Sequence, residues 1–147
     1  MDTDKSFQAN RASTARMKQL VEGLSDQQLN IVLPNGWTVS VTLAHLAFWD
    51  QRVSRVIEMA QMQGKVIRTE LDIQLNDILE PFFRAIPPRE AVRLALESAD
   101  KLDQQLEDCS AERIGQLEVE SPRWVDRSLH RNDHLDEIEK FLHQYAN

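Results

Sequence analysis

The strongest constraint on the fold is the recurrence of apolar side chains at every third or fourth position over four long segments. Such spacing gathers apolar groups on one side of an α-helix, where they can pack against other helices. Glycine is rare, with 4 residues in 147, and runs of β-branched residues are few, which both favour helix over sheet. We therefore expect an all-α protein whose long helices cover residues 3–24, 38–63, 88–107 and 127–145.

Residues that cap or break helices divide this pattern into elements. Thr38 is a suitable N-cap for the second long helix, and Gly64 is a suitable end for it. A shorter apolar stripe predicts a helix over 72–86, which the following Pro-Pro pair separates from the third long helix. Residues 109–128 have no sustained period, so we expect a loop with at most short turns. The predicted architecture is a four-helix bundle with an extra short helix between its second and third helices.

Composition limits the class of protein. A chain of 147 residues fits a single domain, 1–147, with a sizeable core. No apolar run approaches the roughly 20 residues of a membrane span, and the start MDTDKSFQAN does not resemble a signal peptide. A single cysteine, Cys109, excludes an intrachain disulfide framework and fits a reducing cytoplasm. The net charge of −7, without a basic block, disfavours nucleic-acid binding.

Three histidines point to a metal site. His130 and His134 are four residues apart, so both imidazoles project from the same side of a helix. His45, in an apolar part of the second long helix, can supply a third ligand if the two helices pack together. Three neutral imidazoles leave a coordination position for water or substrate, as in catalytic sites. His143 falls on the opposite face of the last helix, and we expect it to be exposed and not a ligand.

Each of these histidines also has a plainer interpretation. The pair could lie exposed where the last helix frays, and a lone histidine such as His45 is commonly a satisfied core residue. We expect the inner stripe of the last helix to consist of His130, His134, Ile138, Phe141, Leu142 and Tyr145.

Helical spacing from the candidate ligands selects Trp49, Arg52 and Glu137 as residues lining a pocket beside them. Glu137 could accept a hydrogen bond from an imidazole N–H or act as a general base. Arg52 could meet an anionic substrate. The alternatives are a solvated glutamate, a surface ion-pair arginine and a core tryptophan. Asn76 and Asp77 are interpreted as the cap of the short helix rather than as the edge of the pocket.

Several segments resemble a known family. Residues 36–49 (GWTVSVTLAHLAFW) resemble the second-helix signature of the DinB/YfiT-like superfamily, and residues 130–134 (HRNDH) resemble its C-terminal H-x-x-x-H motif. Residues 76–79 (NDIL) and 86–91 (IPPREA) resemble one branch, which includes proteins similar to the N-terminal domain of mycothiol-dependent maleylpyruvate isomerase. The resemblance covers essentially the whole chain in helix order and length.

The resemblance implies a four-helix bundle in which His45, His130 and His134 bind a divalent metal. Members of the family include thiol-dependent S-transferases and isomerases and proteins that protect against a reactive toxin, and many have no known activity. One segment departs from the pattern, because residues 121–124 carry no family signature. Substrate contacts in that segment therefore stay unassigned.

Taken together, the sequence predicts a cytoplasmic, dimeric metalloprotein that acts on a small-molecule substrate and not on nucleic acid or membrane. The favoured function is a metal-dependent transferase or isomerase that works with a low-molecular-weight thiol. The alternative is a non-catalytic protein that binds or sequesters a small molecule, with a structural metal or none. Imidazole ligands suit Zn, Ni, Fe(II) and Mn, so the sequence does not select the metal.

Overall fold

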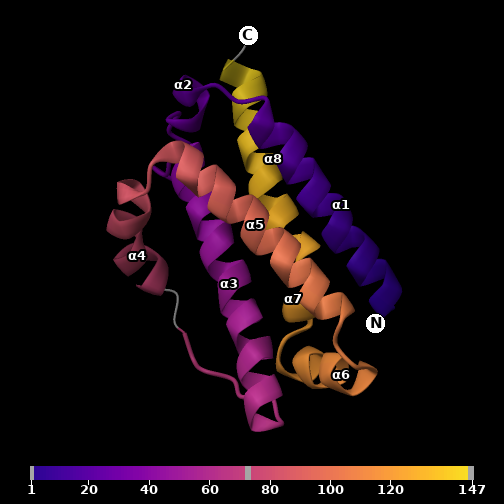
Figure 1. The fold of residues 1–147 in the computed structure, drawn as a ribbon. Helices are drawn as coiled ribbons and strands as arrows, with labels where there is room; N and C mark the ends of the chain where they lie inside the picture. Colours follow the sequence, from indigo (N-terminus) through magenta and orange to yellow (C-terminus); the bar gives the residue numbers. More distant parts are fainter. Residues whose placement is uncertain (1, 72–73, 146–147) are drawn as a thin grey trace.

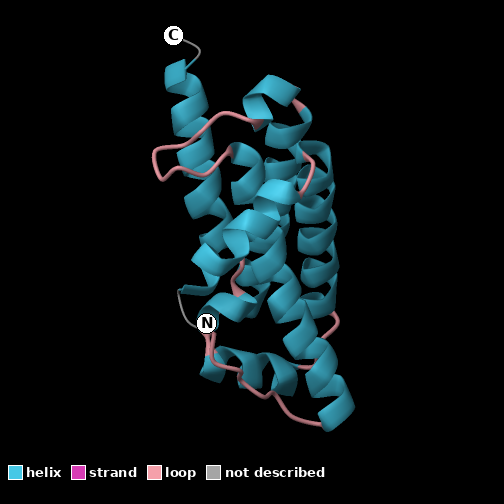
Figure 2. Cartoon of the chain, turned by 90° about the vertical axis from the view of Figure 1, so that its left-hand side faces the viewer, coloured by secondary structure: helices cyan, strands magenta, loops and turns pink. Residues whose placement is uncertain are grey.

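Four long helices run alongside one another and form the body of the molecule (Figure 1). The computed structural model describes residues 2–71 and 74–145, which form eight helices and no strand beyond an isolated bridge (Figure 2). The all-α bundle expected from the sequence is thereby confirmed. Its long helices are α1 (Thr3–Glu22), α3 (Val39–Gln63), α5 (Pro88–Glu107) and α8 (Ser128–Tyr145).

The predicted helix ends are found where capping chemistry places them. The Thr38 side chain accepts a hydrogen bond from the backbone N–H of Val41 and starts α3. Gly64, with φ of +78°, ends α3 in the left-handed conformation that glycine adopts without steric cost. Ser25 and Gln28 form a reciprocal capping box at the short helix α2 (Asp26–Leu29).

The short helix predicted over 72–86 is present as α4 (Gln74–Ala85), and the predicted residues 72 and 73 lie outside the described residues. The loop predicted over 109–128 is wrong, because it contains α6 (Ala111–Glu120) and the single turn α7 (Pro122–Val125). Ser110 is the N-cap of α6. Only two side chains of this helix, Ile114 and Leu117, are buried. The sequence did not predict α6 because its apolar stripe is short and lies among charged residues.

The interior consists of two apolar clusters joined by a buried polar layer. One cluster includes Met17, Leu43 and Leu135, toward the end of the bundle where α2 lies. The other cluster packs α6 and α7 against the opposite end of α3 and α5, and it comprises Val53, Val56, Ile57, Leu102, Leu106, Ile114, Leu117, Trp124 and Val125. Between the clusters, α1, α3, α5, α8 and the residue before α8 contribute polar side chains that are almost fully buried, namely Asn10, Asp50, Asp103, Arg131 and Arg127.

Charged hydrogen bonds connect the members of this polar layer. Arg131, on α8, donates from Nε to Asp50 Oδ2 at 3.0 Å and from Nη1 to Asp103 Oδ1 at 2.8 Å. Arg127 donates from Nε to the second Asp50 oxygen at 2.9 Å. The Asn10 side chain accepts from the backbone N–H groups of Arg127 and Ser128, which start α8. Because each buried charge has an opposite partner, the layer ties α1, α3, α5 and α8 into one register.

The predicted inner stripe of the last helix is only partly correct. Arg131 is fully buried, while Tyr145 is 67% exposed. The helix therefore turns the stripe of Arg131, Leu135 and Ile138 toward the core. This rotation leaves His130 and His134 half-buried at the edge of the core, on the side that meets α3. The sequence pattern did not predict this orientation of α8, because an arginine such as Arg131 is normally expected on the solvent-exposed face of a helix.

Candidate metal centre

Three imidazoles from two helices converge at the contact between α3 and α8. The Nε2 atoms of His45 and His130 are 3.1 Å apart. The His134 ring centroid lies 4.8 Å from that of His45 and 5.0 Å from that of His130. One nitrogen from each ring can be chosen so that all three lie within 4.8 Å of one another. The expected meeting of these three histidines across one helix–helix contact is confirmed.

Burial keeps all three histidines neutral at physiological pH. Loss of hydration lowers the pKa of His45 to about 3, and the charges of His134 and Arg127 add to this effect. Burial, followed by the charge of Arg127, lowers the pKa of His130 to about 2. The pKa of His134 is also lowered by burial, against the opposing effect of Glu137 and Asp133. Each ring therefore keeps a lone pair that can bind a metal.

The spacing of the ring nitrogens fits a divalent ion. A tetrahedral ion with bonds of about 2.1 Å holds its ligand nitrogens about 3.4 Å apart. The 3.1 Å separation between His45 and His130 is close to that value, and small side-chain rotations would bring His134 into range. Among residues 2–71 and 74–145, no cysteine, aspartate, glutamate or fourth histidine joins this group. The three histidines could thus hold a metal with a vacant coordination position.

Arg127 imposes a condition on metal binding that the sequence did not reveal. Its Nη2 lies 3.2 Å from Nδ1 of His130, and a guanidinium can only donate. Nδ1 therefore accepts, so the ring proton of neutral His130 is on Nε2, which faces His45. A metal bound at Nε2 requires this proton to move to Nδ1, and Arg127 must then release its hydrogen bond. Metal-binding histidines more commonly have an acceptor at this position.

The family comparison covers most of the chain and all three histidines. Residues 9–137 match the family model described as the DinB superfamily. The chain belongs to the DinB superfamily. The match is to the superfamily as a whole and does not select the branch of the mycothiol-dependent isomerase. No curated protein and no solved structure matches the chain.

Two tryptophans border the histidine cluster of this DinB protein. The ring centroid of Trp37 lies 4.9 Å from that of His45, and the ring is stacked against that of His134 at 6.5 Å. A tight turn places it there, because the backbone N–H of Leu33 donates to the Trp37 carbonyl at 2.7 Å. Trp49, one helical turn after His45, has its ring 6.3 Å from that histidine. The sequence prediction selected Trp49 as a pocket residue and did not select Trp37.

The two charged pocket candidates lie in different places. A carboxylate oxygen of Glu137 is 4.0 Å from Nδ1 of His134, beside the metal candidate. Arg52 instead stacks over Trp49 and Trp124, with its guanidinium carbon 5.9 and 4.9 Å from the ring centroids. Arg52 also donates from Nη2 to the carbonyl oxygen of Thr69.

Three further polar residues considered in the sequence, Asn76, His143 and Cys109, lie outside the group of three histidines. Asn76 lies inside α4 and accepts a hydrogen bond from Trp49 Nε1 at 3.1 Å, so its predicted role as a helix cap is wrong. His143 is exposed, as expected. Burial raises the pKa of the Cys109 thiol, which agrees with the absence of an activating motif around it.

Proposed function

We propose that this DinB protein binds a divalent metal through His45, His130 and His134 and uses it to catalyse a reaction of a small molecule. The observation that carries the proposal is the convergence of three neutral imidazoles without a fourth protein ligand in the described residues. Three-ligand sites with a vacancy are typical of catalytic metals, and four-ligand sites of structural ones. We further propose that the reaction is a transfer or isomerisation that uses a low-molecular-weight thiol.

A bound metal of this kind would supply a Lewis acid that lowers the pKa of a water or thiol at the vacancy. The protein's own residues would control access and orientation. The Trp37 and Trp49 rings cover two sides of the cluster and limit the approach of water. Glu137 has a carboxylate oxygen 4.0 Å from Nδ1 of His134, and a side-chain rotation that shortens this distance would let it accept the Nδ1–H and orient that ring toward the metal. Zn, Ni, Fe(II) and Mn all suit such ligands.

Metal content is the first test. Protein produced without an affinity tag should contain about one equivalent of a transition metal by mass spectrometry. His130→Ala should lose most of it, and His143→Ala, which removes an exposed histidine of the same helix, should keep it. Equal metal content in the two variants would show that the ligands lie on another face.

Cobalt substitution tests the vacancy and the thiol together. Addition of a small thiol to the Co(II) protein should produce a sulfur-to-cobalt charge-transfer band, because a vacant position accepts a thiolate. His45→Ala serves as the matched variant with a disrupted site. A visible spectrum that does not respond to any added ligand would indicate a closed, structural metal.

The hydrogen bond from Arg127 to His130 favours a second candidate, a protein that binds or sequesters a small molecule without a metal. The hydrogen bond gives Nδ1 of His130 a partner in the metal-free protein. Because metal binding would break this bond, it lowers the affinity of the site for a metal. The two candidates differ in zinc affinity: a dissociation constant weaker than about 1 μM, or about −8 kcal/mol, would favour the metal-free role.

We further propose that the protein is a cytoplasmic homodimer. The chain has a mass of 17.0 kDa, so light scattering should give about twice that mass. A value near 17.0 kDa at micromolar concentration would exclude the dimer. As a separate structural finding, no described helix combines the length and apolar character needed to cross a membrane.

A further inference from the structure

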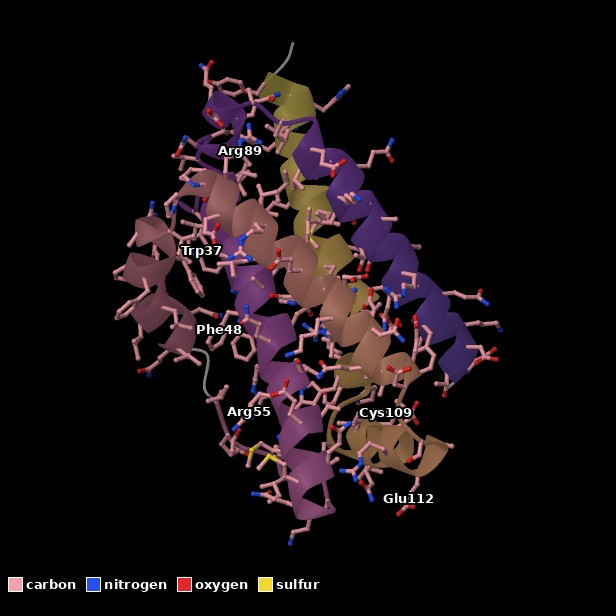
Figure 3. The ribbon with its side chains drawn as sticks, in the orientation of Figure 1. Trp37, Phe48, Arg55, Arg89, Cys109 and Glu112 are labelled. Atoms are coloured by element: carbon pink, nitrogen blue, oxygen red, sulfur yellow. The ribbon has the colours of Figure 1, made fainter. Side chains whose placement is uncertain are left out.

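A cavity of about 490 Å³ lies beside α3, away from the three histidines. Its floor is formed by side chains of α3, and its wall by the segment that follows α3. The labelled side chains of Phe48 and Arg55 lie along this part of α3 (Figure 3). We name this cavity the Arg52 pocket, and its apolar lining consists of Phe48, Val56, Met59 and Ile67.

Arg52 is an unusual residue for such a lining. Two tryptophan rings cover its guanidinium, and its one hydrogen bond to a described residue runs from Nη2 to the Thr69 carbonyl oxygen at 2.7 Å. Its Nε is buried and has no acceptor in the part of the chain that the structure describes. Within residues 2–71 and 74–145, no carboxylate lies within ion-pair distance of Arg52. Among the described residues, the pocket therefore contains a half-buried positive charge without a carboxylate partner.

Neighbouring arginines increase this positive potential. Burial lowers the pKa of Arg52, and the charges of Arg68 and Arg127 lower it further, although an arginine remains charged at neutral pH. Arg68 donates to the backbone carbonyl of Glu120, so its charge also has no carboxylate partner among the described residues. Arg55 also lines the pocket, but its charge is partly offset by an ion pair with Glu58 at 3.3 Å. In a chain with a net charge of −7, this is a local excess of positive charge.

We propose that the Arg52 pocket binds an organic anion with an apolar body and one carboxylate. The apolar side chains would cover the hydrocarbon part of the ligand, since pockets of about 300–1,000 Å³ accommodate small organic molecules. The guanidinium lies over the two tryptophan rings and Nη2 already donates to Thr69, so a carboxylate would pair with the N–H groups that remain at the edge of the guanidinium. A neutral molecule of the same shape would leave the charge unpaired.

This site is separate from the proposed metal centre. None of the three histidines lines the Arg52 pocket. The Trp49 ring lies between the two sites, 6.3 Å from the His45 ring and 5.9 Å from the Arg52 guanidinium carbon. Binding of an anion in the Arg52 pocket therefore does not require a metal at the histidines.

The test uses three ligands that share a ten-carbon chain: decanoate, decanol and decyl phosphate. Binding is measured by calorimetry, with the fluorescence of Trp49 and Trp124 as a second signal. Decanoate should bind at least about tenfold more tightly than decanol, because only the carboxylate pairs with Arg52. No detectable decanoate binding at millimolar concentration, or equal affinity for decanol, would overturn the proposal. A tenfold preference for decyl phosphate would overturn the assignment of a carboxylate.

Variants at the pocket rim keep the test decisive if Arg52 is needed for folding. Ile67 lines the pocket and is 44% exposed, so it tolerates charged side chains. Ile67→Glu should weaken decanoate binding about tenfold, while Ile67→Lys should retain it, because the two differ mainly in charge. Equal affinities of these two variants for decanoate would contradict an electrostatic anchor.

Arg52→Gln should also lose the preference for decanoate over decanol. Arg93→Gln removes the same charge from the exposed face of α5, where Arg93 pairs with Glu90, and should bind decanoate as the wild type does. Each titration is repeated with zinc-loaded and with EDTA-treated protein, and equal affinities are expected. Binding of decanoate only to the zinc-loaded protein would place the ligand on the metal and overturn the separate site.

Discussion

At the scale of single residues, Arg127 determines how available His130 is to a metal. The arginine is held by Asp50 Oδ1 at 2.9 Å and by the Arg123 carbonyl at 2.9 Å, so it cannot move away without loss. Its remaining donor is directed at Nδ1 of His130. A neutral ring has one proton and one lone pair available to accept, so a metal at Nε2 and a donor at Nδ1 cannot both be satisfied.

Replacing Arg127 with lysine should tighten zinc binding about tenfold, because the ring proton can then occupy Nδ1 without displacing a donor. Lysine keeps a positive charge for Asp50, which limits the damage to the buried layer. Competition with a fluorescent chelator measures the affinity. Arg84→Lys, on α4, is the matched control and should leave it unchanged. Weaker zinc binding by Arg127→Lys would mean that the arginine supports the metal instead.

The lowered pKa values of the histidines predict a loss of stability in acid. Below about pH 6.5 the unfolded chain binds protons at these rings while the folded protein does not, so the free energy of unfolding falls as pH decreases. For His45, with its pKa lowered to about 3, the loss is about 1.4 kcal/mol per pH unit. Urea denaturation of metal-free protein at pH 7 and 5 measures it.

The control for this prediction is His45→Gln, which should reduce the dependence on pH, whereas His143→Gln at an exposed site should not. Identical pH profiles for wild type and His45→Gln would show that His45 is not buried as a neutral ring.

At the scale of helices, local patterns predicted most of the fold. Capping and breaking residues located the ends of α3 and α5, since these signals act within a few residues. The orientation of α8 could not be predicted in this way. This orientation depends on hydrogen bonds from Arg131 to Asp50 and Asp103, which lie on two other helices. The spacing of residues along one helix does not predict such contacts between helices. The three histidines stood out by type and spacing, but Arg127 had no comparable signal.

Removing Arg131 should cost about 3–5 kcal/mol of unfolding free energy, because Asp50 and Asp103 would lose a buried partner. Arg131→Ala tests this by urea denaturation, and Arg93→Ala, at an exposed ion pair of α5, should change stability by less than about 0.5 kcal/mol. A loss below about 1 kcal/mol for Arg131→Ala would mean that water reaches the polar layer.

At the scale of the whole molecule, the polar layer connects the two candidate sites to the bundle. Arg127 links the layer to His130 through one hydrogen bond and to Asp50 through another. The charge of Arg127 also lowers the pKa of Arg52 in the Arg52 pocket. The layer separates two apolar clusters that hold the ends of the bundle together. The histidines thus lie at a contact between helices whose register is already set by buried charges.

A metal at this position would join α3 to α8 and should stabilise the entire fold. Free zinc at about 100 times its dissociation constant should raise the unfolding free energy by about 2.7 kcal/mol, because the unfolded chain does not bring His45 near His130. Thermal and urea unfolding with and without zinc measure the effect, and magnesium, which prefers oxygen ligands, should have none. At the same free zinc concentration, His45→Ala should lose most of the gain and His143→Ala should keep it. Equal stabilisation of both variants would mean that zinc binds to α8 alone and does not bridge the two helices.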